Sequence, residues 1–241
     1  MQERFCFLSQ IRTSIKKFII CLQPRGNFLI PILNIACGFL VLLLLVAEKK
    51  QWTLGIWLFK TSASFSFVAL AWAHQALLKG PYGWCILSAV IFCMIGDILL
   101  IPHEKKYFMM GVGAFLLGHL GFLAAFFSSF ASFNLWWLLL AVLAEVCFIF
   151  FIMRWPWAEI PKELFIPVNI YIVVISAMVA VAASGVGAGA SRTTLLAAVM
   201  FFISDISVAR HQFRARVFMN KLWGLPLYYG AVLLFVSTLA G

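Results

Sequence analysis

Charge is the scarcest property of this chain. Only 11% of its 241 residues are charged, eight of them are acidic, and 64% are hydrophobic. A soluble globular domain has about 25% charged residues, so this composition excludes such a domain. The gaps between the apolar stretches are short, which leaves no room for an extramembrane domain.

The usual signatures of metal and redox chemistry are also missing. The six cysteines form no CxxC pair, and the four histidines follow neither HExxH nor a comparable ligand spacing. The net charge of +10 is spread over the N-terminal tail and the ends of apolar stretches. We therefore expect attraction to membrane lipids, no nucleic-acid partner, and no metal or organic cofactor.

What the chain has instead is a series of long apolar runs. A helix needs about 20 apolar residues to cross a hydrocarbon core. Eight runs qualify, and we predict an all-α, multi-pass integral membrane protein whose residues 29–241 form one bundle of about eight transmembrane helices; in a bacterium it would lie in the inner membrane. The predicted spans are 29–47, 54–78, 82–101, 107–130, 135–153, 163–185, 193–212 and 222–240.

Residues 1–28 differ from the rest of the chain. Ile11, Ile15 and Leu22 follow helical spacing, and basic residues such as Arg12 and Lys16 oppose them. This pattern predicts a basic amphipathic helix on an anionic membrane surface, with an unstructured basic tail as the alternative. Its five Lys/Arg favour a cytoplasmic N-terminus, whereas the loops on the opposite side hold ten; we expect both termini in the cytoplasm.

Two aspartates lie inside predicted spans. Asp97 falls in Gly96-Asp97-Ile98-Leu99-Leu100, and Asp205 in Phe202-Ile203-Ser204-Asp205. A carboxylate at the centre of a bilayer costs about 2.5–3.5 kcal/mol on insertion scales, so such residues mark functional sites by default. The alternative is that each forms a buried pair with a cation, which we disfavour because few intramembrane cations are available.

Other polar residues share the depth of these aspartates. Consecutive spans alternate in direction, so the ends of odd spans and the starts of even spans lie on one side of the membrane. By this rule the two aspartates gather with Lys60 and a set of further side chains, and we predict a polar cavity open to one membrane face. The further candidates are His119, Asn169, Tyr171, Ser204, Tyr228 and Tyr229.

Each of these residues also has a simpler interpretation. Lys60 can snorkel to the interface, His119 can bond a neighbouring helix, and the tyrosines can form an interfacial belt. Glu145, in the fifth span, is expected to be a structural partner of Lys60 or His119. Small residues in the fourth span are expected to serve close helix packing, namely Gly111, Gly113, Gly118 and Gly121.

Two carboxyl groups in one low-dielectric site indicate acid/base chemistry. Burial and mutual repulsion keep one protonated while the other is ionised, so one donates a proton while its partner activates water or stabilises a developing cation. In a membrane cavity the natural substrate is amphiphilic. The residues alone thus predict a two-Asp hydrolase or a proton-coupled carrier acting on a lipid-like molecule.

The same motifs resemble those of the YhhN-like lysoplasmalogenases. Gly96-Asp97-Ile98-Leu99-Leu100, Phe115-Leu116-Leu117-Gly118-His119 and Phe202-Ile203-Ser204-Asp205 follow one another in the order of that family, and Lys60, Tyr171 and Tyr228-Tyr229 fit the same template. The resemblance covers about residues 30–240. Two positions depart from it, because Thr61 replaces a frequent proline and Phe122 lacks the hydroxyl of a frequent aromatic residue.

The resemblance implies hydrolysis of the vinyl-ether bond of a choline or ethanolamine lysoplasmalogen by water. The products would be a fatty aldehyde and glycerophosphocholine or glycerophosphoethanolamine. Asp97 and Asp205 would be catalytic, and the remaining candidates would contact the lysophospholipid or orient an aspartate. The residues leave open which aspartate carries the proton.

Two rival functions are less well supported by the sequence. A proton-coupled transporter would also gather carboxylates in a cavity, but the two Asp motifs have different surroundings and the chain shows no matching halves. An intramembrane aspartyl protease would need Gly-x-Gly-Asp, and Met94 stands where the first glycine is required.

Overall fold

The computed structural model describes residues 28–102, 104–153 and 160–240. In these ranges the chain forms eight long α-helices and two short 3-10 helices, and it contains no strand. The expected amphipathic helix falls almost entirely outside these ranges. The long helices are α2 (Leu29–Lys49), α3 (Thr53–Ala73), α4 (Gly80–Leu99), α5 (Lys105–Ser129), α6 (Leu135–Met153), α7 (Lys162–Gly187), α8 (Arg192–Phe213) and α9 (Phe218–Ser237).

The predicted fold class is confirmed. In the described ranges, seven helices are long and apolar enough to cross a membrane. The remaining one, α6, has a shorter described apolar stretch, Leu135–Phe150, so its crossing stays a prediction. Large apolar side chains are exposed on the outer faces of the helices, as lipid contact requires.

The boundaries of the helices follow local chemistry. The second predicted span divides into α3 and a 3-10 turn (Ala76–Leu78), because Gln75 adopts a left-handed backbone with φ of 61°. Gly80 then takes φ of +66°, which glycine permits, and Pro81 lies in the first turn of α4, where its missing N–H costs nothing.

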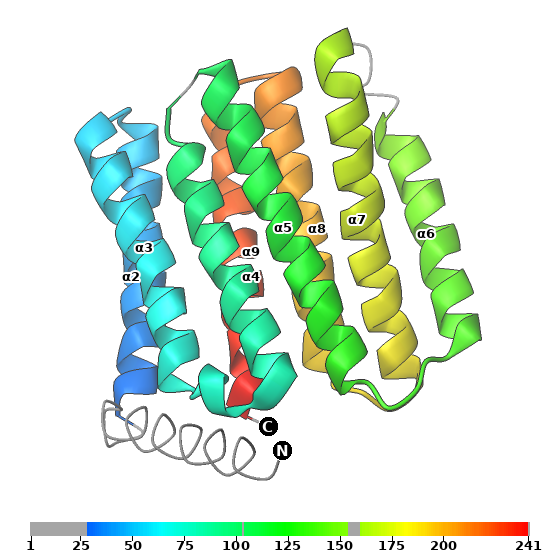
Figure 1. Cartoon of the computed structure of the whole chain (residues 1–241). Helices are drawn as coiled ribbons and strands as arrows, with labels where there is room; N and C mark the ends of the chain where they lie inside the picture. The colour runs from blue at the N-terminus through cyan, green and yellow to red at the C-terminus, as the bar shows by residue number, and fades with distance from the viewer. Residues whose placement is uncertain (1–27, 103, 154–159, 241) are drawn as a thin grey trace, which may run out of the picture.

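The helices pack into pairs that are then joined side by side. The most extensive contacts are between α4 and α5, α8 and α9, and α2 and α3. Figure 1 shows α2 and α3 at one edge of the bundle and α6 at the other, where α6 packs mainly on α7. Near the centre, α9 contacts α2, α3, α4 and α8, so it connects the two sides of the bundle.

Close approach of α4 and α5 depends on glycines of α5. A Cβ added at Gly121 would lie 2.9 Å from the Cβ of Ala89, and one at Gly118 would lie 3.0 Å from the Sγ of Cys93. The packing role predicted for these residues and for Gly111 is confirmed. For Gly113 the prediction is wrong, because no atom lies within 4 Å of an added Cβ.

The pair Gly121 and Gly113 gives a matched test of this packing. Both lie in α5, so replacement by alanine adds about the same helix propensity, about 0.8–1.0 kcal/mol. Gly121→Ala also forces a methyl group against the backbone of Ala89, and such overpacking costs about 1–3 kcal/mol. Thermal unfolding in detergent should therefore show a lower midpoint for Gly121→Ala than for Gly113→Ala. Equal midpoints would contradict the packing assigned to Gly121.

Candidate active site

A cavity of about 240 Å³ lies inside the bundle, and both aspartates line it. Its wall runs from the aspartates to residues at the helix ends on one side, such as Pro102, Phe213 and Lys221. Most of the residues selected by their depth line it too: Lys60, Tyr171, Ser204 and Tyr228. The rule of alternating spans therefore places polar groups from helices far apart in sequence in one cavity.

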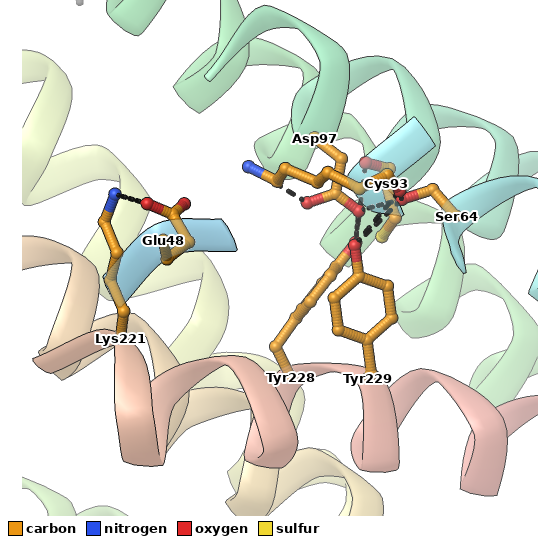
Figure 2. Close-up of polar contacts among 8 residues, drawn as sticks. Glu48, Ser64, Cys93, Asp97, Lys221, Tyr228 and Tyr229 are labelled. Atoms are coloured by element: carbon orange, nitrogen blue, oxygen red, sulfur yellow. Dashed lines mark hydrogen bonds and ion pairs between the residues drawn. The ribbon is translucent and has the colours of Figure 1, made fainter. Parts of the chain in front are cut away.

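Asp97 is bound by three side chains from two other helices. Ser64 of α3 donates a hydrogen bond to its Oδ2 (2.5 Å), and Tyr228 of α9 donates to the same atom (2.7 Å). Lys60 Nζ lies 3.5 Å from Oδ1, and both members of this ion pair are buried. Figure 2 shows Ser64 and Tyr228 converging on Asp97.

Helical spacing explains how α3 supplies two of these partners. Lys60 and Ser64 are four residues apart, so they lie on the same face of α3, one turn from each other. Tyr229 supports this face from α9, since its hydroxyl lies 3.2 Å from Ser64 Oγ and 3.3 Å from the carbonyl oxygen of Lys60. Tyr229 thus orients the partners of Asp97 and does not line the cavity.

Asp205 is held by a different set of groups. Tyr171 of α7 donates a hydrogen bond to its Oδ2 (2.6 Å). His119 of α5 places Nε2 at 2.8 Å from the Tyr171 hydroxyl and 3.4 Å from the same Oδ2. The side chain of Asp205 is 17% exposed, against 3% for Asp97, so Asp205 is the more accessible of the two.

The geometry around His119 indicates its tautomer. The Tyr171 hydroxyl donates its proton to Asp205, so its oxygen accepts from the N–H at Nε2 of His119. Nδ1 of His119 is buried and has no hydrogen-bond partner among the described residues. A proton on Nδ1 would lack an acceptor there, so the contacts favour the neutral ring protonated at Nε2.

Aromatic rings join the two aspartate clusters. The ring of Phe201 packs edge-on against His119 (centroids 4.6 Å apart) and against Tyr228 (5.3 Å). Phe115 packs edge-on against Tyr228 at 5.6 Å. The hydroxyl of Tyr228 thus reaches Asp97 while its ring belongs to an apolar group that also fixes His119.

Much of the rest of the cavity wall is apolar. It comes mainly from α6, α7 and α8, and it includes Phe148, Ile149, Ile172, Ile175, Phe202 and Ile206. The cavity therefore has a polar wall that carries the carboxyl groups and an apolar wall that suits a hydrocarbon chain.

Two of the remaining expectations, for Asn169 and Glu145, need revision. Asn169 does not line the cavity, because its side-chain amide donates to the carbonyl of Phe165 in its own helix (2.6 Å). Glu145 pairs with neither Lys60 nor His119; it lies beside Ser176 of α7, and its Oε1 has no partner among the described residues. Ser204 lines the cavity, but its hydroxyl donates to the carbonyl of Phe201 (2.7 Å).

The partners of the aspartates bear on the expectation that too few intramembrane cations are available to neutralise both. Asp97 does form the buried pair with a cation that we disfavoured, with Lys60, whereas Asp205 contacts the imidazole of His119. The two partners differ, because a lysine carries a full charge whereas the contacts of His119 favour its neutral form. The pairing therefore distinguishes the two aspartates, because it does not neutralise both of them.

The sequence interpretation missed one ion pair in the cavity wall. Lys221 of α9 lies with its Nζ 2.6 Å from Oε2 of Glu48 in α2, and both residues line the cavity. Glu48 is 5% exposed. The available signal was depth, since Glu48 directly follows the first predicted span (29–47) and Lys221 directly precedes the eighth (222–240).

The part of the chain that carries this site matches a known protein family. The model of the YhhN family matches residues 55–239, which include every residue of the two aspartate clusters. The chain belongs to the YhhN family. No solved structure matches it.

Curated relatives carry names that agree with this membership. The chain is 26% identical to bovine lysoplasmalogenase TMEM86A over 224 residues, which is 90% of each chain. It is 30% identical over 174 residues to the lysoplasmalogenases of Mycobacterium bovis and Mycobacterium tuberculosis. That match covers 71% of this chain and 64% of each mycobacterial protein.

The Lys60–Asp97 pair predicts a coupling in stability. Lys60→Met leaves a buried carboxyl without its cation, and breaking a buried pair on one side costs about 3–5 kcal/mol. Adding Asp97→Asn removes the unpaired charge, so the double variant should be more stable than Lys60→Met alone. Unfolding midpoints of the four proteins in one detergent measure this coupling. Additive losses would show that the pair does not exist in the protein.

Proposed function

We propose that this YhhN-family protein is a lysoplasmalogenase that hydrolyses the vinyl-ether bond of lysoplasmalogens. The observation that carries the proposal is one cavity, lined by two aspartates with unequal partners and by an apolar wall for a lipid chain. The names of the bovine and mycobacterial relatives support the same substrate class.

The reaction begins with transfer of a proton to carbon. Hydrolysis of an enol ether requires protonation of the β-carbon of the vinyl group, which leaves an oxocarbenium ion. Water then adds to the cation and loses a proton, and the resulting hemiacetal collapses to a fatty aldehyde and a glycerophospho-alcohol. The site must therefore supply one acid and one group that stabilises positive charge.

We assign the acid to Asp205. Its partners Tyr171 and His119 are neutral in the tautomer favoured by their contacts, and no formal cation faces it in the described residues. It is also the more exposed carboxyl group. Tyr171 and His119 hold it in place, and its cavity-facing carboxyl group regains a proton from water after each turnover.

We assign the stabilising role to Asp97. The ammonium of Lys60 lies beside it, and Ser64 and Tyr228 both donate hydrogen bonds to its Oδ2, which are the contacts that bind a carboxylate. A fixed carboxylate in a dry site stabilises an oxocarbenium ion more strongly than water does, because no solvent must reorganise. The same carboxylate accepts the proton from the attacking water.

The position of the incoming proton tests this reaction. When purified protein acts on a lysoplasmalogen in D2O, the aldehyde should carry one deuterium on the carbon next to the carbonyl group. Mass spectrometry of the aldehyde, trapped as it forms, measures the label. Unlabelled aldehyde would exclude protonation at carbon. If the protein releases no aldehyde from either lyso- or intact plasmalogens with either headgroup, the proposed lysoplasmalogenase activity is refuted. Aldehyde release by the protein in detergent would exclude a function as a transporter alone.

Replacement of the aspartates tests whether both are needed for catalysis. Asp205→Asn and Asp97→Asn should each lower kcat by a factor of at least about 10², which is the usual contribution of a positioned acid or a charge-stabilising group. Tyr171→Phe should lower kcat less than Asp205→Asn, because it removes a positioning bond and leaves the acid. Aldehyde release and thermal unfolding are measured on the same preparations. Full activity in both Asn variants would end the two-aspartate mechanism.

A further inference from the structure

The ion pair of Glu48 and Lys221 lies in the wall of the same cavity, away from the aspartates. Lys221 Nζ is 2.6 Å from Glu48 Oε2, and the side chains are 21% and 7% exposed. Figure 2 shows this pair as a group separate from Ser64, Asp97, Tyr228 and Tyr229. The hydrolysis derived above uses neither residue.

The position of the pair along α9 sets its depth. Lys221 precedes Tyr228 by seven residues, which is close to two helical turns, so both lie on one face of α9. The rise between them is about 10 Å. Because Tyr228 bonds Asp97, the ion pair lies about two turns from the reacting groups toward the end of the bundle where α2 ends and α9 begins.

The length of a lysophospholipid matches this separation. Seven bonds separate the phosphorus from the vinyl carbon that receives the proton, and the amine nitrogen lies four bonds further. Extended chains span about 1.2 Å per bond, so these distances are about 8 Å and 13 Å. A substrate with its vinyl ether at the aspartates therefore places its headgroup at the depth of Glu48 and Lys221.

The chemistry of the pair matches the headgroup as well. A phosphodiester next to an amine presents one negative and one positive group, and the pair presents the complementary charges. Lysine is a usual phosphate ligand, and a carboxylate binds an ammonium by charge-assisted hydrogen bonds. A buried ion pair seldom stabilises a protein more than packed apolar residues do, because the cost of removing two charges from water offsets their attraction. A purely structural role therefore gives little reason for a charged pair at this position.

We propose that Glu48 and Lys221 form the headgroup subsite of this cavity, where Lys221 binds the phosphate and Glu48 binds the amine of a zwitterionic lysophospholipid. This inference rests on the proposed function. The pair opens when the substrate enters, and each residue exchanges its partner for the matching charge of the headgroup. The headgroup brings one charge of each sign, so the exchange leaves no charge uncompensated in the cavity.

Three substrates with one alkenyl chain test the subsite: 1-alkenylglycerol, 1-alkenylglycerophosphate and 1-alkenylglycerophosphoethanolamine. Lys221→Gln should raise KM about tenfold to a hundredfold for the two phosphate substrates, the range expected for loss of a hydrogen bond to a charged group. It should leave kcat/KM for the alkenylglycerol within about threefold of wild type. Glu48→Gln should raise KM for the ethanolamine substrate only.

Two variants distinguish this role from a structural tie. The double variant Glu48→Lys/Lys221→Glu keeps an ion pair with reversed polarity, so it should restore stability but not the KM for phosphate substrates. Lys221→Arg keeps the charge and should stay near the wild-type KM. As a matched control, Lys105→Gln removes the cation of an exposed ion pair with Glu163 that does not line the cavity, and its KM should not change.

The outcomes separate the subsite from the proposed function. Restoration of wild-type KM by the reversed pair would overturn the subsite, as would an equal effect of Lys221→Gln on the alkenylglycerol. Unchanged KM in Lys221→Gln would overturn it too, provided that thermal unfolding shows a folded protein. If the wild-type protein releases no aldehyde from any substrate, the proposed function fails first.

Discussion

Hydrocarbon offers no hydrogen-bond partners, so each polar side chain that this bundle buries has to find its partner within the protein. The contact on which most of the site depends is the one between Lys60 and Asp97. It joins α3 to α4, and Ser64 and Tyr228 bring α3 and α9 to the same carboxylate. Removing any member leaves a charge or a hydroxyl group without a partner at a depth where water is scarce. The geometry of the wall that carries the aspartates is therefore held by the same contacts that hold the helices together.

The two carboxyl groups differ because their partners differ. Lys60 brings a full positive charge to Asp97, whereas Tyr171 and His119 bring a neutral chain of hydrogen bonds to Asp205. Asp97 is also the less exposed of the two. A protein that needed two equivalent carboxylates, for example as ligands of one ion, would have no use for such a difference. An acid and a stabilising anion require it.

The depth of a residue in the membrane could be predicted from the sequence, whereas the direction in which its side chain points around the helix axis could not. The direction of each span fixes which side of the membrane a residue lies on, and this brought Lys60, Asp97, Asp205 and Tyr171 together correctly. Each residue also turns by about 100° around its helix. Asn169 lies two residues before Tyr171, so it faces about 200° away from the side chain that lines the cavity.

The same rotation explains the other differences within single helices. Gly111 and Gly118 are seven residues apart and both face α4, while Gly113, two residues after Gly111, faces away. Tyr228 and Tyr229 differ by about 100°, so one lines the cavity and the other supports Ser64. Sequence spacing could have excluded Asn169 and Gly113 once one cavity-facing residue per helix was known. Glu145 was beyond such reasoning, because the position of α6 at the edge of the bundle depends on tertiary packing.

If the substrate is the proposed lysoplasmalogen, the arrangement of polar and apolar walls follows the arrangement of that lipid in a bilayer. In the lipid the vinyl ether lies just below the glycerol and the phosphate, and the chain continues toward the midplane. In the bundle the Glu48–Lys221 pair lies nearest the helix ends, the aspartates lie about two turns deeper, and Phe148, Ile175 and Phe202 line the apolar wall. A lipid that enters in its membrane orientation brings its reactive bond to the carboxyl groups without being lifted into water. The cost of extracting an alkenyl chain, about 0.8 kcal/mol per CH2, is thereby avoided. The depth of the aspartates is then set by the substrate, which explains why two costly carboxyl groups lie inside the hydrocarbon instead of at its surface.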